Sequence, residues 1–253
     1  MHSILVITKE TSLTLLRSKI FYPALAFYFF LIIIANIISS WGIIEFYKLL
    51  FDLGLFFFHF VGVSIAILWG SDIIHQAQKE GYIELQLSSP IKRYQWVIGK
   101  YAGLLICLSL LSLSILLLWQ LFMLINNFGW LGHNVIPFIS QIFLIFIAAS
   151  MTVFFASFCR YTITIFLSYI FWFIGLCNPI LFSSIPENIH WHYKIIIQSL
   201  NTIWNLQIFN LNYSDFNNSP PSFYNIAWLS VYSLSLIFLF LSFAAIIFEK
   251  KDI

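Results

Sequence analysis

Charged residues and cysteines are scarce in this chain of 253 residues. Only 9% of the residues are Asp, Glu, Lys or Arg, the formal net charge is +2, and there are three cysteines. So small a charge excess argues against nucleic acid as a partner. Cys107, Cys159 and Cys177 stand far apart and form no CxxC pair. We therefore expect no disulfide framework and interpret the cysteines as small apolar side chains.

The motifs of common catalytic and nucleotide-binding sites are also missing. The sequence contains no HExxH, no GxSxG with partner residues and no GxxxxGK[ST] phosphate loop. We therefore expect no catalytic residue, no metal, no cofactor and no ATP site in this chain. His190 and His192 have a spacing found in metal sites, but no third ligand stands close by. An interfacial aromatic cluster is the favoured interpretation of this pair, and metal binding stays open.

Apolar residues dominate what is present. The chain is 61% hydrophobic and 20% aromatic, with a mean hydropathy of +0.93, which is typical of a polytopic membrane protein. Apolar runs of about 20 residues cross a bilayer as helices. Six such runs predict an all-α membrane domain over residues 1–253, with spans at Ile20–Ser40, Leu53–Ser71, Gly99–Ile125, Val135–Cys159, Thr162–Ser184 and Phe223–Phe248.

The segment before the first span, residues 1–19, is too polar to cross the bilayer. Val6, Leu13, Leu16 and Ile20 form a helical stripe in a segment that also carries charged residues. This pattern predicts an amphipathic helix on the membrane surface, with an ordinary solvated helix as the alternative. The segment also lacks the short apolar core and cleavage site of a signal peptide.

The distribution of basic residues indicates the orientation of the spans. Six spans place both termini and the even-numbered connections on one side, with ten of the 12 basic residues: Lys9, Arg17, Lys19, Lys79, Lys92, Arg93, Lys100, Arg160, Lys250 and Lys251. Lys48 and Lys194 fall on the other side. The positive-inside rule predicts that the ten-rich side, and both termini, are cytoplasmic.

The longest predicted external connection runs from Ile185 to Ser222. Within it, Tyr193–Phe209 is mildly apolar and predicts one or two helices resting on the membrane face. The Asn/Ser/Pro-rich end of the connection indicates a loop. Asn178-Pro179 just before it predicts a break in the outer half of the fifth span.

A few polar side chains fall inside the predicted spans. His59 is the one titratable residue well within a span, and it has no acidic partner there. Such residues are candidates for function or for hydrogen bonds between helices. The candidates for polar groups along a translocation path are Asn36, His59, Gln120, Gln141 and Asn178.

The main polar segment of the first half, Asp72–Lys100, predicts a folded cytoplasmic connection at residues 72–98. A helix continues the second span and stops near Gly81. Ser89 and Pro90 then fit the N-cap and first position of a new helix that continues through Trp96. The result is a helix–break–helix projection with mixed charge, suited to docking on a cytosolic partner. A plain connecting loop is the alternative.

This segment resembles a known family. The residues Gly81-Tyr-Ile-Glu-Leu-Gln-Leu-Ser-Ser-Pro90, the following Ile-Lys-Arg93 and then Gly99-Lys100-Tyr-Ala-Gly103 resemble the turn and third-span opening of ABC-2 type membrane subunits. Phe51-Asp-Leu-Gly-Leu55 and Leu68-Trp-Gly-Ser71 are similar to the branch linked to maturation of multicopper enzymes. Gln76-Ala-Gln78 departs from the acidic residue that the family commonly has there.

The resemblance implies a permease subunit of an ABC exporter in a prokaryotic inner membrane. It implies a dimer with a second copy or a related permease, an N-terminal elbow helix, and a coupling helix that docks on a separate cytosolic ATPase, which binds ATP and Mg²⁺. The residues expected at the coupling surface are Glu80, Gly81, Tyr82, Glu84, Leu87, Ser89, Pro90, Lys92 and Arg93, and Gly99 and Lys100 open the third span. The alternatives are a haem-exporter-like subunit of cytochrome c maturation and a secondary transporter.

Overall fold

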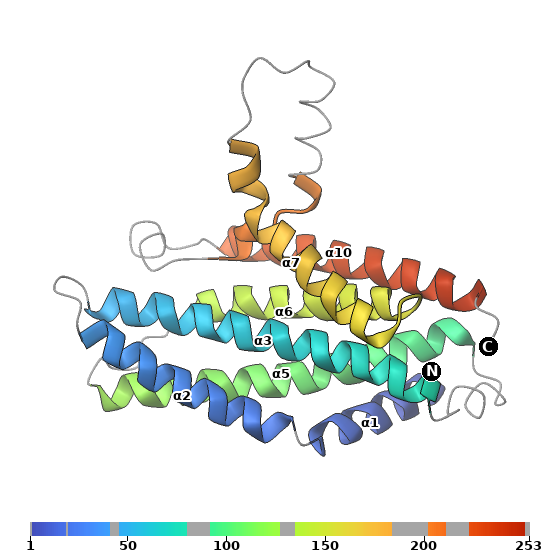
Figure 1. The fold of residues 1–253 in the computed structure, drawn as a ribbon, viewed down its shortest axis with the longest axis horizontal. Helices are drawn as coiled ribbons and strands as arrows, with labels where there is room; N and C mark the ends of the chain where they lie inside the picture. Colours follow the sequence, from blue (N-terminus) through green and yellow to red (C-terminus); the bar gives the residue numbers. More distant parts are fainter. Residues whose placement is uncertain are drawn as a thin grey trace, which may run out of the picture.

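The structure is helical throughout the part of the chain that it describes. The computed structural model describes residues 2–18, 20–40, 46–79, 92–126, 135–183, 202–210 and 223–250. Within these ranges it has no strand, one 3-10 helix, η2 (Gln207–Phe209), and seven α-helices: α1 (His2–Leu16), α2 (Phe21–Ser40), α3 (Phe46–Lys79), α5 (Arg93–Ile125), α6 (Val135–Ala156), α7 (Tyr161–Ser183) and α10 (Phe223–Lys250). The predicted all-α fold is confirmed (Figure 1).

Six of these helices are long and apolar enough to cross a membrane, and they coincide with the six predicted spans: α2, α3, α5, α6, α7 and α10. Two are much longer than a bilayer requires. α3 has 34 residues and α5 has 33, which at 1.5 Å per residue gives about 50 Å each. The final turns of α3 confirm that the helix continues from Asp72 to Lys79.

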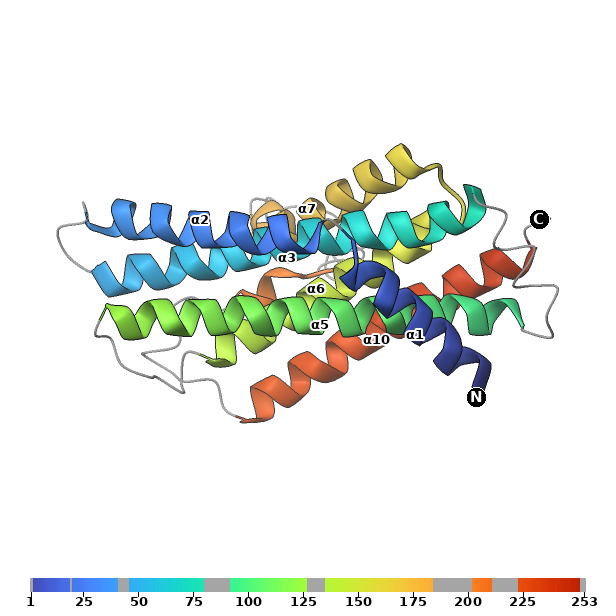
Figure 2. The ribbon, with the colours of Figure 1, turned by 90° about the horizontal axis from the view of Figure 1, so that it is seen from below.

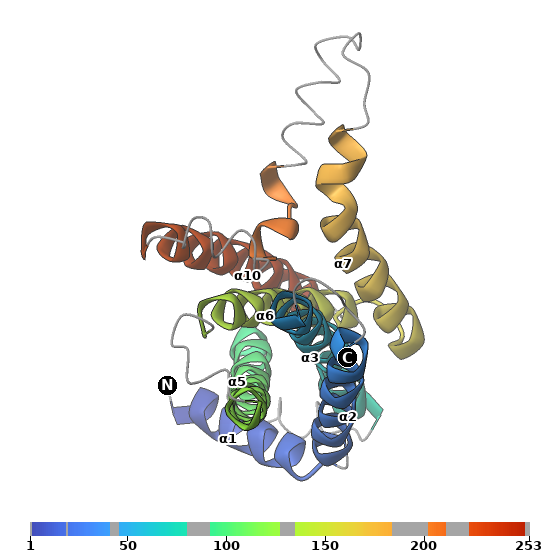
Figure 3. The same cartoon turned by 90° about the vertical axis from the view of Figure 1, so that its left-hand side faces the viewer.

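α3 and α6 form the centre of the bundle. Most of their spanning segments are buried, 67% for α3 and 72% for α6, against 17% for α2 and 22% for α7. α2 and α5 lie beside this central pair, and α7 leans away from the bundle (Figures 1 and 3). The two termini, the end of α3 and the start of α5 lie at one end of the bundle (Figure 1). We call this the terminal end.

Small residues bring α3 and α6 close together. A Cβ added at Gly70 would stand 3.2 Å from Thr152 Cβ, so a larger residue there would require Thr152 to shift by a few tenths of an ångström. Ala148 and Ala149 of α6 are also buried. Because lipid supplies no hydrophobic force between helices, close backbone approach through small residues is a main source of packing in membranes.

The N-terminal helix α1 lies along the first turns of α5 (Figure 2). It buries Ile7, Thr11 and Leu15, which are spaced by one helical turn. The predicted apolar stripe faces elsewhere, since Val6 is 55% exposed and Leu13 is 43% exposed. α1 therefore has two apolar faces, one for α5 and one that is uncovered. The sequence pattern identified only the uncovered face.

The predicted break at Asn178-Pro179 is wrong. α7 is helical through Pro179 to Ser183. Proline has no N–H and so leaves the carbonyl four residues earlier, that of Gly175, without its helical partner. The backbone N–H of Leu206 donates to this oxygen over 3.1 Å. A second segment thus supplies the missing hydrogen bond, and the helix continues.

The contact between α1 and α5 depends on Gly103. A Cβ at this position would lie 2.7 Å from Thr11 Cβ and 2.9 Å from the Thr8 carbonyl oxygen. We predict that Gly103→Leu destabilises the protein by about 1–3 kcal/mol because α1 must move away. Thermal unfolding in detergent measures this effect, and alkylation of the buried Cys107, whose thiol donates to Ser12 O, reports the displacement.

The matched control is Ser109→Leu, which adds the same side chain at an exposed position of α5. It should melt at the wild-type temperature and leave Cys107 protected. A Gly103→Leu variant with unchanged melting and an unreactive Cys107 would contradict the contact.

Candidate functional site

The predicted coupling surface is only partly within the described residues. Seven of its residues lie outside them: Glu80, Gly81, Tyr82, Glu84, Leu87, Ser89 and Pro90. Its second half consists of the extended residue Lys92 and the beginning of α5, up to Lys100. Because α3 and α5 both extend to the terminal end, the segment that joins them is anchored there at both of its ends (Figure 1).

α5 begins at Arg93, so the predicted continuous helix from Pro90 through Trp96 is wrong. Lys92 is extended, with φ −71° and ψ 141°. Its backbone N–H donates to Gln95 Oε1 over 3.4 Å. A polar side chain three residues into a helix commonly accepts from the backbone just before it, which favours a helix start at this point. The sequence analysis predicted that this helix starts at Ser89-Pro90 and did not consider Gln95.

Arg93 contacts the last turn of α10. Its Nη1 donates to the carbonyl oxygens of Phe248, at 3.4 Å, and Glu249, at 3.2 Å. The last four carbonyls of a helix have no partner within that helix, and a cation near them is favoured by about 0.3–1 kcal/mol. The guanidinium thus caps α10, while Lys92 beside it in sequence is exposed.

Aromatic stacking extends this contact along α5. Trp96 and Phe248 are fully buried, and their rings stack with centroids 5.1 Å apart and planes 18° apart. Lys100 Nζ lies 5.6 Å from the centroid of the Trp96 ring, a cation–π distance. We call Arg93, Trp96, Lys100 and Phe248 the α5–α10 junction. An aromatic pair of this kind contributes about 0.5–1.5 kcal/mol.

The Gly99-Lys100 motif of the third span holds α1 as well. A Cβ at Gly99 would lie 3.0 Å from Ile7 Cβ. Thr8 Oγ1 donates to the Gly99 carbonyl over 3.3 Å. Gly99 and Gly103 therefore form a small-residue surface, in the spacing that allows helices to approach closely in membranes. The start of α5 is thus in contact with both α1 and α10.

The predicted polar residues of the spans divide into two groups. His59, Gln141 and Asn178 belong to a hydrogen-bonded network around residues 202–210. Gln120 is buried elsewhere, and neither atom of its amide has a hydrogen-bond partner among the described residues. Asn36, on α2, is half-buried. The structure therefore does not gather these five residues into one site.

Gln141 is the centre of the network. Its Nε2 donates to the carbonyl oxygen of Phe209, at 3.3 Å, and to Asn210 Oδ1, at 3.4 Å. Its Oε1 lies 2.5 Å from His59 Nδ1. Because the amide nitrogen faces the acceptors at 209 and 210, the network assigns the proton to His59 Nδ1 and the lone pair to its Nε2. Ser140 Oγ also donates to Phe209 O, over 2.8 Å.

α7 and α10 hold the same segment from the other side. Asn178 Nδ2 donates to the carbonyl oxygen of Trp204. The Tyr232 hydroxyl donates to Ile203 O over 2.8 Å. Gly175 permits the close approach, because a Cβ there would meet the Leu206 side chain at 2.7 Å. We call residues 202–210 the strap.

The strap is the end of the segment predicted to form one or two helices on the membrane face. Thr202 and Ile203 are helical, η2 spans Gln207–Phe209, and Leu206 and Phe209 are buried. Residues 193–201 lie outside the described residues. Sequence reasoning missed Ser140, Trp204 and Tyr232. The signal that could have found the strap is the carbonyl freed by Pro179, which requires a donor from elsewhere in the chain.

The described residues offer no metal centre. They contain no group of three or more His, Cys, Asp or Glu side chains that could hold a metal ion. The three cysteines are free thiols. His190 and His192 lie outside the described residues, so their metal binding stays a prediction.

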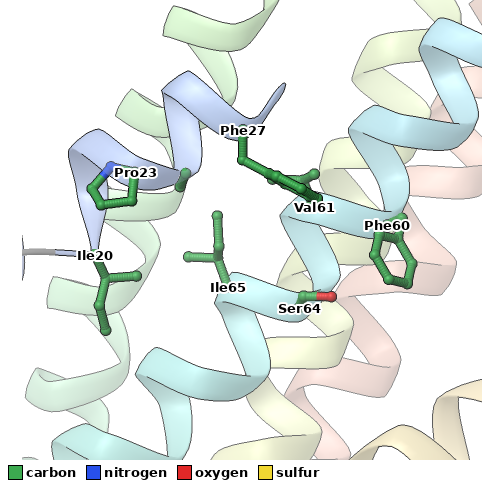
Figure 4. A pocket seen from close by; sticks show the side chains of 8 residues that line it. Ile20, Pro23, Phe27, Phe60, Val61, Ser64 and Ile65 are labelled. Carbon is green, nitrogen blue, oxygen red and sulfur yellow. The ribbon is translucent and has the colours of Figure 1, made fainter. Parts of the chain in front are cut away.

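A groove lies between α2 and α3. It has a volume of about 410 Å³. Its lining is apolar except for the Ser64 hydroxyl and includes Ile20, Pro23, Phe27, Phe60 and Ile65 (Figure 4). No titratable group lines the groove, so its lining supplies no general acid or base.

The decisive comparison is with families of known proteins. The family model described as "ABC-2 family transporter protein" matches residues 4–253. The chain belongs to the ABC-2 transporter family. It is therefore a multi-pass membrane component of a transporter, as the resemblance at Gly81–Gly103 predicted. No curated protein gives a significant match, and the link to multicopper enzyme maturation stays a prediction.

The network around Gln141 gives a prediction with a built-in control. We predict that Gln141→Leu destabilises the ABC-2 protein by about 1–3 kcal/mol, because it removes the donor to Phe209 O and leaves His59 Nδ1 buried without a partner. The strap should then become more sensitive to added protease in detergent.

Gln120→Leu is the matched control. The same substitution at a buried amide without a partner should be neutral or slightly stabilising. Equal melting temperatures for the two variants would show that the Gln141 network does not hold the strap.

Proposed function

We propose that this chain is the permease subunit of an ABC exporter and that a separate ATP-binding subunit docks on the coupling region, residues 72–98, which includes the connection between α3 and α5. The observation that supports this proposal is the reach of both helices to the terminal end. α3 continues to Lys79 and α5 begins at Arg93, so both ends of the connection are held by rigid helices. Membership of the ABC-2 family implies such a partner.

The charge distribution supports a cytoplasmic position for this end. Two described basic residues, Lys92 and Arg93, stand at the start of α5, which lies at this end. Lys48 lies in the first turn of α3, at the opposite end. By the positive-inside rule, this distribution supports a cytoplasmic position for both termini and the connection. A multi-pass position in the inner membrane of a prokaryote follows from the family resemblance.

ATP hydrolysis belongs to the partner on this proposal. Closure of two ATP-binding subunits would pull on the connections of two permease subunits, either identical or related, and shift the spans between inward-open and outward-open states. The described spans carry no matched pair of broken helices, since α7 is continuous through Pro179. A secondary transporter, in which such pairs are common, is therefore the weaker interpretation.

The docking surface can be tested without knowledge of the cargo. We predict that the double variant Glu84→Lys/Lys92→Glu loses the co-purifying ATP-binding subunit by about tenfold or more, because reversed charges oppose the partner's complementary surface. Lys92 is preferred to Arg93 because Lys92 is exposed, whereas Arg93 holds α10. The measurement is the ratio of the two subunits after mild-detergent purification, together with vanadate-sensitive ATP hydrolysis.

The control reverses a pair predicted to lie on the external side, Glu187→Lys/Lys194→Glu. It should retain the partner at the wild-type ratio, and both variants should melt like the wild type. If Glu84→Lys/Lys92→Glu keeps the ATP-binding subunit, or if the wild-type chain never purifies with one, the proposed function is wrong.

A further inference from the structure

The α5–α10 junction stands where a force on the connection would enter the bundle. Arg93 is the first residue of α5, and the connection ends immediately before it. Its guanidinium contacts carbonyl oxygens of Phe248 and Glu249, residues 155 and 156 positions later in the chain. Figure 2 shows the end of α10 beside the beginning of α5. Arg93, which was expected on the docking surface, thus makes its hydrogen bonds to another helix of the same chain.

The contact between the two helix ends involves several side chains of α5. Three side chains of α5, at spacings of three and four residues, take part: Arg93 at the carbonyls, Trp96 against the Phe248 ring, and Lys100 over Trp96. Residues with this spacing lie on one face of a helix. Trp96 and Phe248 are both 0% exposed, so water does not compete for their stacking.

α1 is attached to the same turns of α5. Gly99 and Gly103 receive Ile7 and Thr11, and Thr8 donates to Gly99 O. The first turns of α5 therefore contact both α1 and α10.

We propose that Arg93 is a positioning residue that joins the end of α10 to the start of α5, so that the connection moves α5, α10 and α1 as one unit. This inference rests on the proposed function, because it states how a pull from the ATP-binding subunit reaches the spans. It changes the role of Arg93 from a contact with the partner to a contact within the permease. The guanidinium donates to helix-end carbonyls that have no hydrogen-bond partner within α10 itself.

The test measures the distance between the two helices by electron–electron double resonance. Spin labels are placed at Ile98→Cys on α5 and Ile246→Cys on α10, both at exposed positions. Cys107, Cys159 and Cys177 are replaced by Ala. The full chain is measured with its ATP-binding subunit in lipid nanodiscs, without nucleotide and with ATP and vanadate. Each background also receives Arg93→Gln or Arg93→Lys.

The wild type should give one narrow distance that is the same in both nucleotide states. In Arg93→Gln the distribution should become roughly twice as wide, because the end of α10 frays when its carbonyls lose their donor. Arg93→Lys, which still donates to carbonyl oxygens, should restore most of the narrow distribution. The ATP-binding subunit should co-purify with Arg93→Gln at the wild-type ratio.

Three results would overturn the proposal: an unchanged width in Arg93→Gln, a wild-type distance that shifts with nucleotide, or loss of the ATP-binding subunit with the distance still narrow. The last would make Arg93 a docking residue. If Arg93→Gln does not accumulate, Phe248→Leu replaces it and should widen the distribution by removing the stacking with Trp96. If no ATP-binding subunit co-purifies with the wild type, the proposed function fails, while the distances in the isolated chain still decide the role of Arg93.

Discussion

Every backbone N–H and C=O within a membrane needs a partner from the protein, and this requirement shapes the whole fold. Helices satisfy it by themselves, which is why the described chain is almost entirely helical. The exceptions occur where a helix cannot supply its own bond. Pro179 frees the carbonyl of Gly175, and the Leu206 N–H of the strap takes it. The last carbonyls of α10 are free by definition, and Arg93 takes two of them. Both contacts join segments far apart in the sequence.

The sequence was a good guide where hydropathy alone decides. All six spans were predicted because about 20 apolar residues in succession have few other stable states. The family was also recognisable, because the turn from Gly81 to Gly103 combines glycine, proline and basic residues at fixed positions. The continuation of α3 to Lys79 followed from the absence of any helix-stopping residue before Gly81.

Pairwise contacts were beyond the sequence reasoning. The exposed apolar stripe of α1 could be recognised because charged residues stand around it in the sequence. The buried face of α1, with Ile7 and Thr11, has no distinctive pattern, and it can be recognised only once Gly99 and Gly103 are known to lie opposite it. Gln141 and Gln120 look alike in sequence, yet one is the centre of a network and the other has no partner among the described residues. Arg93 was assigned by its position to the docking surface, since nothing local indicates carbonyls that are 155 residues away.

α10 contacts both the strap and the start of α5, although most of its spanning segment is not buried by the rest of the chain. Tyr232 binds the strap at one end, and Phe248 joins α5 at the other. The 16 residues between them span about 24 Å of helix. Between these two contacts α10 also packs against α6, and Leu236, Phe240 and Ala244 are buried along its length. The strap lies at the end of that path, where it also contacts α6 and α7 through Gln141 and Asn178. A movement that begins at Arg93 would therefore have a continuous route of packed and hydrogen-bonded contacts along α10 to the strap, and this route depends on a helix that would look peripheral if burial were the only measure.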